Sequence, residues 1–308
     1  MTEPAIVAIA NPKAANGRAG RIATRLVRFL KEGGVDVSLR FTAMAGDATR
    51  LAREAVAAGA QVVLSVGGDG TNNEVVNGFF HGPPEVRSKT AFAIAPVGTG
   101  GDFAKTVRQS GESREVLARL QRSQRRTIDV GRVEFAGFDG KLASRYVINI
   151  AEFGSGGAVV EKVNRTTKIL GGRMSFLMAI LSVMPKYRNR RVRYRIDGGP
   201  ERELIANNFV VANGRYFGGG LMPAPQAELD DGLFDVVVIG DLDFKTIRRH
   251  LKDLRAGTHL SLPGVTFARG REVVTRDTEG ALLDLDGELV GRDPTRFVCV
   301  PKALDLLV

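Results

Sequence analysis

The sequence is poor in the residues that build disulfide bonds and metal sites. Its 308 residues include one cysteine, three histidines and no tryptophan. A single cysteine, Cys299, excludes a disulfide bond within the chain and is typical of proteins from a reducing compartment. The histidines, His81, His250 and His259, lack the spacing of a metal site.

Long hydrophobic runs are also missing. The longest run, MSFLMAILSVM at residues 174–184, falls well short of the roughly 20 apolar residues that cross a bilayer as a helix. The N-terminal segment MTEPAIVAIANPK has neither the basic start nor the long apolar stretch of a signal peptide. We therefore expect a cytoplasmic protein without a membrane span.

The overall composition is that of a globular protein with a strong positive net charge. Apolar residues make up 44% and charged residues 25% of the chain, and the length suffices for two domains. The net charge of +10 favours an anionic partner, whether nucleic acid, anionic lipid or a polyanionic substrate.

The densest basic cluster is KYRNRRVRYR at residues 186–195. In its second half arginine alternates with apolar residues, which predicts a strand with one solvated face. The arginines then either face water or contact an anionic surface, and the sequence leaves both readings open. Nucleic acid is the weaker partner, because the cluster has no aromatic-rich RNA-binding signature and no zinc-finger spacing.

Strand and helix patterns alternate in the first part of the chain. Short aliphatic strands are predicted at AIVAIANP, DVSLRFT, QVVLSVGG and AFAIAPVG. Between them lie helical stripes in AGRIATRLVRFLKEGG and GDATRLAREAVAAGA, and a helix after Thr71. This alternation predicts a Rossmann-like α/β domain, in which helices cover both faces of a parallel sheet.

The pattern changes after about Asp129, where most segments become strand-like. They are DVGRVEF, ASRYVINIAEFG, RVRYRID, NNFVVANG, FDVVVIG, GVTFARGREVVTR and ALLDLDGELV. Only two helical stretches interrupt them, at residues 173–184 and 244–254. We predict a mainly antiparallel β-domain at residues 130–292, after an α/β domain at residues 1–129 on which the segment from about 293 to 308 packs back.

Four glycine-marked loops follow the four predicted strands of the first domain: NPKAANGRAG, FTAMAGD, GGDGTNNE and PVGTGGDFA. In an open parallel sheet, ligands bind beyond the carboxyl ends of the strands. In the third loop, glycines surround Asp69 just before a predicted helix. Glycines bring a ligand close to backbone N–H groups, and a helix N-terminus favours an anion, most often phosphate. Asp69 is otherwise a turn former that caps the helix.

These motifs carry a resemblance to a known family. GGDGTNNE has neither the dinucleotide-binding nor the Walker spacing. It resembles the catalytic domain of diacylglycerol kinases, and specifically the bacterial diacylglycerol-kinase-like lipid kinases. The matching pieces, in the family's order, are NPKAANGRAG, GGDGTNNEVVNGF, PVGTGGDFA, NGRYFGGGLMPAPQAELDDGLFDVVVI and LDLDGELVGRDPTRFVCVPKALDLLV. Two departures are Gly101, where the family has asparagine, and a stretched first motif.

The resemblance implies a fold and an activity. The fold is a nucleotide-binding α/β domain like that of phosphofructokinases and NAD kinases, followed by an antiparallel β-sandwich domain that binds the lipid. The activity is transfer of the γ-phosphate of ATP to a hydroxyl of diacylglycerol or a related lipid, with ATP and Mg²⁺ as cofactors. Two other classes stay open: a soluble NAD-kinase-like enzyme, and a non-catalytic nucleotide- or lipid-sensing protein.

The resemblance also implies roles for residues of the glycine-marked loops. Asp69 is then a ligand of the catalytic Mg²⁺, because magnesium prefers oxygen donors. The backbone N–H groups of Gly68, Gly70 and Thr71 hold phosphate oxygens. The other implied nucleotide-binding residues are Asn11, Thr42, Gly67, Glu74, Thr99 and Asp286.

Two carboxylate motifs lie in the second domain. LDLDGELV by itself predicts a hairpin with Asp286-Gly287 at its turn, and the resemblance makes Glu288 the general base for the lipid hydroxyl. AELDDGLFD predicts a turn at its Asp-Gly pair. There the resemblance implies a second, structural Mg²⁺, bound by Asp231 and the main-chain oxygens of Glu228 and Leu233.

The implied partners are the lipid substrate at the membrane surface and anionic phospholipid on the inner face of the membrane, with a homodimer as a further candidate assembly. Residues 174–184 are either an interfacial segment or a core helix. Apolar residues at helical spacing fit both: Leu170, Met174, Leu177, Met178 and Leu181.

Overall fold

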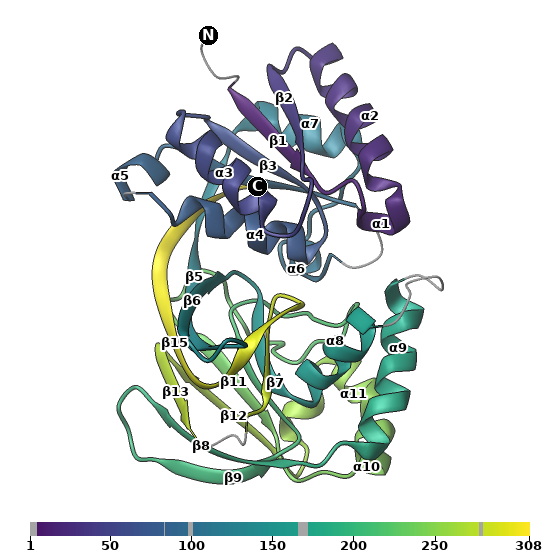
Figure 1. Cartoon of the computed structure of the whole chain (residues 1–308), viewed down its shortest axis with the longest axis vertical. Coiled ribbons are helices and arrows are strands. Elements are labelled where there is room, and N and C mark those ends of the chain that lie inside the picture. Colours follow the sequence, from purple (N-terminus) through teal and green to yellow (C-terminus); the bar gives the residue numbers. More distant parts are fainter. Residues whose placement is uncertain (1–4, 83, 98–100, 166–171, 277–279) are drawn as a thin grey trace. The chain divides into compact units, whose positions relative to one another are not determined.

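The computed structural model describes residues 5–82, 84–97, 101–165, 172–276 and 280–308. The chain divides into two compact units, Met1–Ile128 with Lys302–Val308, and Asp129–Pro301 (Figure 1). Strands β5 (Arg125–Gly137) and β15 (Glu288–Leu307) carry the chain from one unit to the other. The returning segment is shorter than the predicted 293–308, because Thr295 to Val298 still pair with a strand of the second unit.

The first unit alternates strands and helices in the predicted order. Its elements are β1 (Ile6–Ala10), α1 (Ala14–Gly17), α2 (Ala19–Glu32), β2 (Val37–Phe41), α3 (Asp47–Ala57), β3 (Val62–Gly67), α4 (Asp69–Phe79), α5 (Pro84–Arg87), β4 (Ala91–Pro96), α6 (Asp102–Thr106) and α7 (Ser113–Arg122). The sheet order is β2-β1-β3-β4, and the end of β15 pairs with β4. All these pairings are parallel, as the sequence predicts.

Buried aliphatic side chains hold this sheet between helices. Strands β1 and β3 are buried along their whole length, which explains their continuous apolar sequence. Helix α2 buries residues spaced three to four apart, and it packs with α7 on one side of the sheet, while α3 packs with α4 on the other (Figure 1). Because the strands are parallel, the loops after β1, β2, β3 and β4 begin at the same edge of the sheet.

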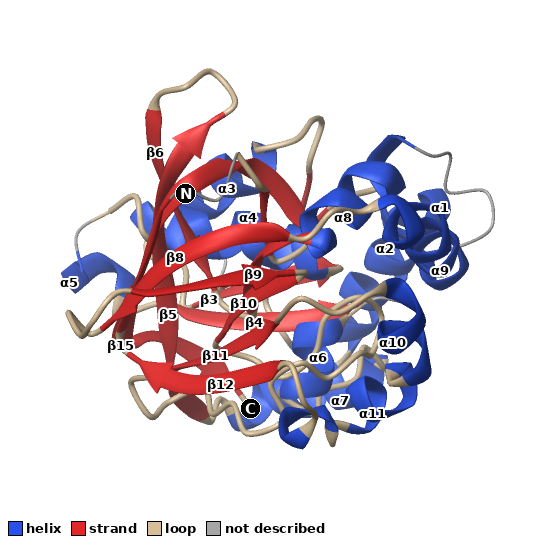
Figure 2. Cartoon of the chain, turned by 90° about the horizontal axis from the view of Figure 1, so that it is seen from below, coloured by secondary structure: helices blue, strands red, loops and turns tan. Residues whose placement is uncertain are grey.

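The second unit is built mostly of antiparallel strands. Its elements are β6 (Leu142–Val147), β7 (Ile150–Gly154), α8 (Ser155–Arg165), α9 (Gly172–Val183), the 3-10 turn η2 (Met184–Lys186), β8 (Arg190–Ile196), β9 (Arg202–Ala206), β10 (Asn208–Ala212), β11 (Phe234–Ile239), α10 (Phe244–Arg249), α11 (Leu251–Ala256), η3 (His259–Ser261), β12 (Val265–Gly270), β13 (Glu272–Arg276) and β14 (Leu282–Leu285). Helices α8 and α9 lie side by side, as do α10 and α11 (Figure 2).

Two antiparallel layers enclose the core of this unit. One layer follows the order β12-β11-β10-β7-β14, and the other contains β9-β8-β13-β15 and the β5-β6 pair. Aromatic rings meet in the core, where Phe153 stacks on Phe209 at 4.8 Å and Tyr194 meets Phe209 edge-on at 5.1 Å. The predicted fold class, a parallel α/β domain followed by an antiparallel β-sandwich, is confirmed.

Local boundaries in the second unit differ from the sequence-based expectation. Helix α8 was not predicted, because Gly156 and Gly157 weaken the helical signal. The segment ASRYVINIAEFG forms two strands, β6 and β7, rather than one. The predicted helix at residues 244–254 is two short helices separated at His250. Among the helices of the described residues, none combines the length and the apolar character needed to cross a bilayer.

Candidate active site

The glycine-rich turn after β3 leaves an open space at the start of a helix. Strand β3 ends at Gly67, and α4 begins at Asp69 with Gly68 as its N-cap. A Cβ atom on Gly67 would lie 2.5 Å from Oγ1 of Thr71, so a larger residue would push the helix away from the strand. A Cβ atom on Gly68 would meet nothing within 4 Å. A ligand can therefore approach the first-turn N–H groups, which have no intrahelical acceptor.

Asp69 joins two of the glycine-marked loops. Its carboxylate accepts the backbone N–H groups of Asp102 at 2.9 Å and Phe103 at 3.1 Å, at the start of α6. Burial, and then the negative charge of Asp102, raise the pKa of Asp69. Lys105 forms an ion pair of 2.5 Å with Asp102. The turn thus places two carboxylates and one ammonium group together at the carboxyl edge of the sheet.

The Mg²⁺ implied by the resemblance fits this group. Carboxylate oxygens are preferred ligands of magnesium, which usually takes one or two carboxylates from a protein and completes its shell with phosphates and water. A divalent cation beside Asp69 and Asp102 would also offset the mutual repulsion that raises the pKa of Asp69.

Gly101, the residue that departs from the family's motif, has a left-handed backbone conformation. Gly101 has φ +66°, in the left-handed region, and precedes α6. Asparagine is the side-chain-bearing residue that adopts this region most readily, so the replacement by glycine changes the polar contact and not the turn. Thr99, predicted to bind the nucleotide, lies outside the described residues.

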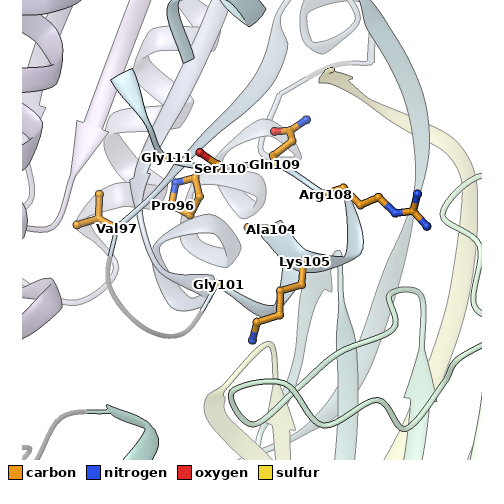
Figure 3. Close-up of a pocket in the computed structure, with 9 residues that line it drawn as sticks. All are labelled: Pro96, Val97, Gly101, Ala104, Lys105, Arg108, Gln109, Ser110 and Gly111. Carbon is orange, nitrogen blue, oxygen red and sulfur yellow. The ribbon is translucent and has the colours of Figure 1, made fainter. Parts of the chain in front are cut away.

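A pocket of about 410 Å³ opens beside this loop (Figure 3). Its cationic side chains are Lys105 and Arg108, which leave the α6 segment in different directions. A Cβ atom on Gly111 would collide with the carbonyl oxygen of Pro96, so glycine is required in the wall. The pocket is lined by Pro96, Val97, Gly101, Ala104, Lys105, Arg108, Gln109, Ser110 and Gly111. Its charge suits an anionic part of a ligand.

Asn11 and Thr42 lie at the same sheet edge, just beyond β1 and β2. The side-chain oxygen of Asn11 accepts the N–H of Lys13 at 3.0 Å, which fixes the turn after β1. Thr42 is buried, and its backbone N–H donates to Ala10 at 3.0 Å. The structure brings both predicted residues to the loops around the glycine-rich turn.

Glu74 holds the neighbouring loop. Its carboxylate accepts the N–H groups of Gly46 at 3.0 Å and Ala48 at 3.1 Å, at the start of α3. A negative charge at a helix N-terminus is stabilising, so Glu74 caps α3 from α4. In this structure the side chain fixes the loop after β2, and its predicted role in nucleotide binding stays a prediction.

In the second unit, Asp286 and Gly287 form the two-residue turn between β14 and β15. Both have positive φ, +51° and +89°, which is the type I′ geometry favoured by an Asp-Gly hairpin. The buried carboxylate of Asp286 accepts the N–H groups of Ile148 at 3.1 Å and of Asn149 and Ile150 at 3.0 Å. These bonds stabilise the break between β6 and β7. Asp286, predicted to bind the nucleotide, acts here as a clamp within the unit.

Glu288 is the first residue of β15 and pairs with Leu285 across the turn. Its side chain is half-buried, whereas Asp286 is 5% exposed. The left-handed turn therefore separates two residues that a regular strand would direct to the same face. Of the two carboxylates, Glu288 is the one accessible to a substrate.

The loop at Asp231 contains an ion pair. Arg269 donates to the carboxylate of Asp231 and, at 2.8 Å, to Asp235. The other carboxylate oxygen of Asp231 accepts the N–H of Leu233 at 3.0 Å. Asp129 accepts the N–H of Gly232 at 2.6 Å, which fixes the turn.

The structural Mg²⁺ expected at Asp231 and the main-chain oxygens of Glu228 and Leu233 stays a prediction. The guanidinium of Arg269 already supplies the positive charge at Asp231. Within the described ranges, no group of three or more His, Cys, Asp or Glu side chains is placed to hold a metal ion. Arg269 was not predicted, because it lies 38 positions from Asp231 and on another strand.

An apolar pocket of about 260 Å³ lies among α10, α11, β11 and β12. It is lined by Ile239, Leu242, Thr246, Ile247, His250, Leu254, His259, Leu262, Pro263 and Val265. Nε2 of His259 lies 3.1 Å from the carbonyl of Pro223, so Nε2 carries the proton. Burial lowers the pKa of His259, and its Nδ1 has no partner among the described residues. The pocket thus has mostly aliphatic walls.

Two surface segments, helix α9 and strand β8, contain the apolar and basic residues that the sequence relates to a membrane surface. Helix α9 exposes Leu177, Met178 and Leu181 by 39%, 53% and 46%, while it buries Ala179. The side chain of Met174 and all of Leu170 lie outside what the structure describes. The helix therefore has both a packed and an exposed apolar side.

The basic strand β8 has the predicted alternation, with Val192 and Tyr194 buried. On its solvated face, Arg191 and Arg193 pair with Glu203 at 2.9 and 2.7 Å, and a further arginine pairs with Glu201. Neighbouring acids therefore offset part of the cationic charge of this face.

Comparisons with known proteins follow the division into two units. The diacylglycerol kinase catalytic domain model matches residues 5–133, and the YegS C-terminal NAD kinase beta sandwich-like domain model matches residues 149–308. The chain is 31% identical over 303 residues to a "Probable lipid kinase YegS-like" protein of Chromohalobacter salexigens, covering 94% of this chain and 90% of the relative. It is 28% identical over 279 residues to a diacylglycerol kinase of Bacillus subtilis, covering 89% and 86%.

Solved structures show the same fold. A chain from Bacillus anthracis, described as a diacylglycerol kinase, aligns with a TM-score of 0.69 at 19% identity, over 98% of this chain and 96% of that one. A second Bacillus anthracis chain, described as a proposed diacylglycerol kinase, aligns with a TM-score of 0.76 at 22% identity, over 100% and 96%.

Proposed function

Because the chain belongs to the diacylglycerol kinase catalytic domain family and carries the YegS-type C-terminal domain, we propose that it is an ATP-dependent lipid kinase. Its reaction is transfer of the γ-phosphate to a hydroxyl group of diacylglycerol or a related lipid. The observation that carries the proposal is the turn at Gly67–Gly68–Asp69. There the first N–H groups of helix α4 face a space that a phosphate can enter.

The first unit would hold the phosphates of ATP. Phosphoryl transfer depends mostly on positioning and on neutralising charge around the transferred group. The N–H groups of Gly68, Gly70 and Thr71 bind phosphate oxygens, and Lys105 and Arg108 add positive charge at the same edge. Mg²⁺, held with the help of Asp69, would neutralise developing charge on the phosphates.

The second unit would supply the base and bind the lipid. Glu288 removes the proton from the lipid hydroxyl, and Asp286 holds its turn in place through three backbone N–H groups. The apolar pocket among α10, α11, β11 and β12 suits an acyl chain. The exposed apolar side of α9 contacts the inner face of the membrane, where anionic phospholipid attracts a protein of positive charge.

The proposal is tested by offering radiolabelled ATP and Mg²⁺ with a panel of acceptors. The panel contains diacylglycerol, a sphingoid base, phosphatidylglycerol and NAD, and a reaction without acceptor gives the background. We expect label in at least one lipid, and the Asp69→Ala variant to lose it. Label in NAD alone would instead indicate an NAD kinase. Absence of transfer to every acceptor would indicate a non-catalytic protein.

A further inference from the structure

The segment between β6 and β7 fixes the turn that precedes Glu288. The carboxylate of Asp286 accepts the backbone N–H groups of three successive residues, 148 to 150, at distances of 3.0 and 3.1 Å. The N–H of Asp286 in turn donates to the carbonyl oxygen of Ile150 at 2.9 Å. Glu288 is the second residue after Asp286 and the first of β15. The position of the segment therefore sets the position of the turn and of the strand end that carries Glu288.

Asn149 is the middle residue of this segment, and its side chain contacts a second loop. The residue is buried, with an exposure of 3%. Its Nδ2 donates to the carbonyl oxygen of Tyr216 at 2.8 Å. Tyr216 belongs to the loop that follows β10, 67 positions further along the chain. Asn149 thus contacts the Asp286 carboxylate through its main chain and a distant loop through its side chain.

Further hydrogen bonds strengthen the same connection. The carbonyl oxygen of Asn149 accepts the N–H groups of Asn213 at 2.9 Å and Gly214 at 2.7 Å. Asn213 is 1% exposed, and its Nδ2 donates to the carbonyl oxygen of Ile148 at 2.9 Å. Together with the bond from Asn149 to Tyr216, these contacts join segment 148–150 to the start of the loop.

The loop is itself held beyond Tyr216, so it can serve as an anchor. Phe217 and Leu221 exchange two backbone hydrogen bonds, both of 3.0 Å, which close the middle of the loop. The N–H of Met222 then donates to the carbonyl oxygen of Leu254 on α11 at 3.1 Å. Segment 148–150 is therefore tied to a loop that is fixed on its far side as well.

An asparagine at position 149 fixes this segment more strictly than an apolar residue of the same shape. A hydrogen bond depends on both distance and angle, whereas apolar contacts are not directional. Leucine has the branching of asparagine but no N–H group to donate. Loss of the bond would therefore let the segment shift while the space stays filled.

We propose that Asn149 is a positioning residue for Glu288. Its amide holds segment 148–150 against the loop, the segment holds the Asp286 carboxylate, and the turn presents Glu288 to the acceptor hydroxyl. A base must lie within hydrogen-bond reach of the proton that it removes, so a small shift of the turn lowers the rate of transfer. Asn149 touches no reacting atom in this role. The assignment rests on the proposed role of Glu288 as general base.

A double-mutant cycle with Glu288 tests the positioning role. Asn149→Leu keeps the shape of the side chain but removes its donor. We expect a single-turnover rate lower by about 10- to 100-fold at unchanged affinity for ATP, because misplacement by a distant substitution costs up to about 100-fold. In the Glu288→Gln background, the same substitution should change the rate by less than about twofold, since the positioned side chain no longer acts as a base. A general loss of stability would instead lower the rate in both backgrounds.

Hydrogen exchange provides a readout that is independent of activity. The N–H groups of residues 148–150 should exchange faster in Asn149→Leu than in the wild type, because the segment loses its anchor. Asn207→Leu is the matched control, since Asn207 is 4% exposed and its Nδ2 donates to Asn189 at 2.9 Å. This variant should lose stability but keep the wild-type transfer rate and the wild-type exchange at residues 148–150.

Three results would overturn the inference. An equal loss of rate from Asn149→Leu in both backgrounds would show that Asn149 does not act through Glu288. A wild-type rate in folded Asn149→Leu would exclude positioning by the amide. Unchanged exchange at residues 148–150 would show that the side chain does not hold the segment. If Asn149→Leu does not fold, the same cycle and exchange measurement with Asn149→Ala decide by the same criteria.

Failure of the proposed function gives a different result. If the wild type transfers phosphate to no acceptor, or if Glu288→Gln keeps the wild-type rate, the base assignment fails, and the positioning role fails with it. Faster exchange at residues 148–150 in Asn149→Leu would in that case still identify Asn149 as the anchor of the segment.

Discussion

The backbone N–H of Asp102 donates to the carboxylate of Asp69 at 2.9 Å, across 33 positions of sequence. This bond joins the loops that follow β3 and β4 at the carboxyl edge of the parallel sheet. Asp69 has two tasks in the proposed mechanism: it holds the start of α6, and it presents a carboxylate to magnesium.

Replacement of Asp69 by alanine should therefore remove both tasks. We expect the transfer rate to fall by at least about 100-fold, the scale for losing one preorganised electrostatic group. The measurement is single-turnover transfer with the folded state checked by circular dichroism. Asp305→Ala is the control, because it removes a partly exposed acid of the same unit that bonds to Thr127 and Arg125. Near-normal transfer by folded Asp69→Ala would contradict the assignment.

Lowering the pH should reduce the stability of the folded protein, because His259 in the wall of the apolar pocket is held neutral. Burial lowers the pKa of this residue below its usual value of about 6.5, so the unfolded state binds the proton more tightly. The contribution of His259 is present above about pH 6.5 and is lost as pH falls through and below that value. Thermal melts from pH 7.5 to 5 should show a smaller decrease for His259→Gln than for the wild type. His81→Gln, at an exposed site, should behave like the wild type.

The loop at Asp231 should keep its stability without metal. Because Arg269 pairs with Asp231, a chelator should leave the melting temperature of the wild type unchanged. Arg269→Gln leaves that carboxylate without its cation and should lower the melting temperature, and Mg²⁺ should then restore part of it. Elemental analysis of the purified wild type measures its magnesium content, and we expect no tightly bound magnesium. Tightly bound magnesium that a chelator removes together with stability would show that the loop is a metal site after all.

Membrane binding should depend more on α9 than on β8. Replacement of Leu177, Met178 and Leu181 by serine should weaken sedimentation with vesicles of anionic phospholipid, because these side chains are exposed. Arg191→Gln with Arg193→Gln should have a smaller effect, since Glu203 already pairs with both. Leu142→Ser, at another exposed leucine, is the control. Equal binding by the α9 variant and the wild type would exclude this surface.

The sequence predicts local features of the site better than its long-range contacts. The Asp286-Gly287 hairpin and the turn at Asp69 are specified by neighbouring residues, through the φ angles that Asp-Gly and glycine tolerate. The contacts of the Asp286 carboxylate are not specified locally, because the N–H groups that donate to it lie 136 to 138 positions away in the sequence. The sequence of a motif does not distinguish a carboxylate that binds a ligand from one that accepts backbone N–H groups.

Helix α8 was not predicted from the sequence, because its tertiary contacts outweigh the weak helical propensity of its residues. Gly156 and Gly157 disfavour a helix in isolation. In the fold Gly157 is required, because a Cβ atom there would collide with the backbone of Leu282, while a Cβ atom at Gly156 would meet the end of the Glu152 side chain. The helix and the buried acid beside it could therefore be recognised only together, once β7 and β14 were paired.

The role of Glu288 as general base is tested most directly by single-turnover transfer in the Glu288→Gln variant. Glutamine keeps the size of the side chain but cannot accept the hydroxyl proton, so we predict a rate lower by about two to four orders of magnitude with ATP affinity nearly unchanged. Glu272→Gln, also at the first residue of a strand in the second unit, should keep the wild-type rate. A Glu288→Gln rate above about a tenth of the wild-type value would contradict the account.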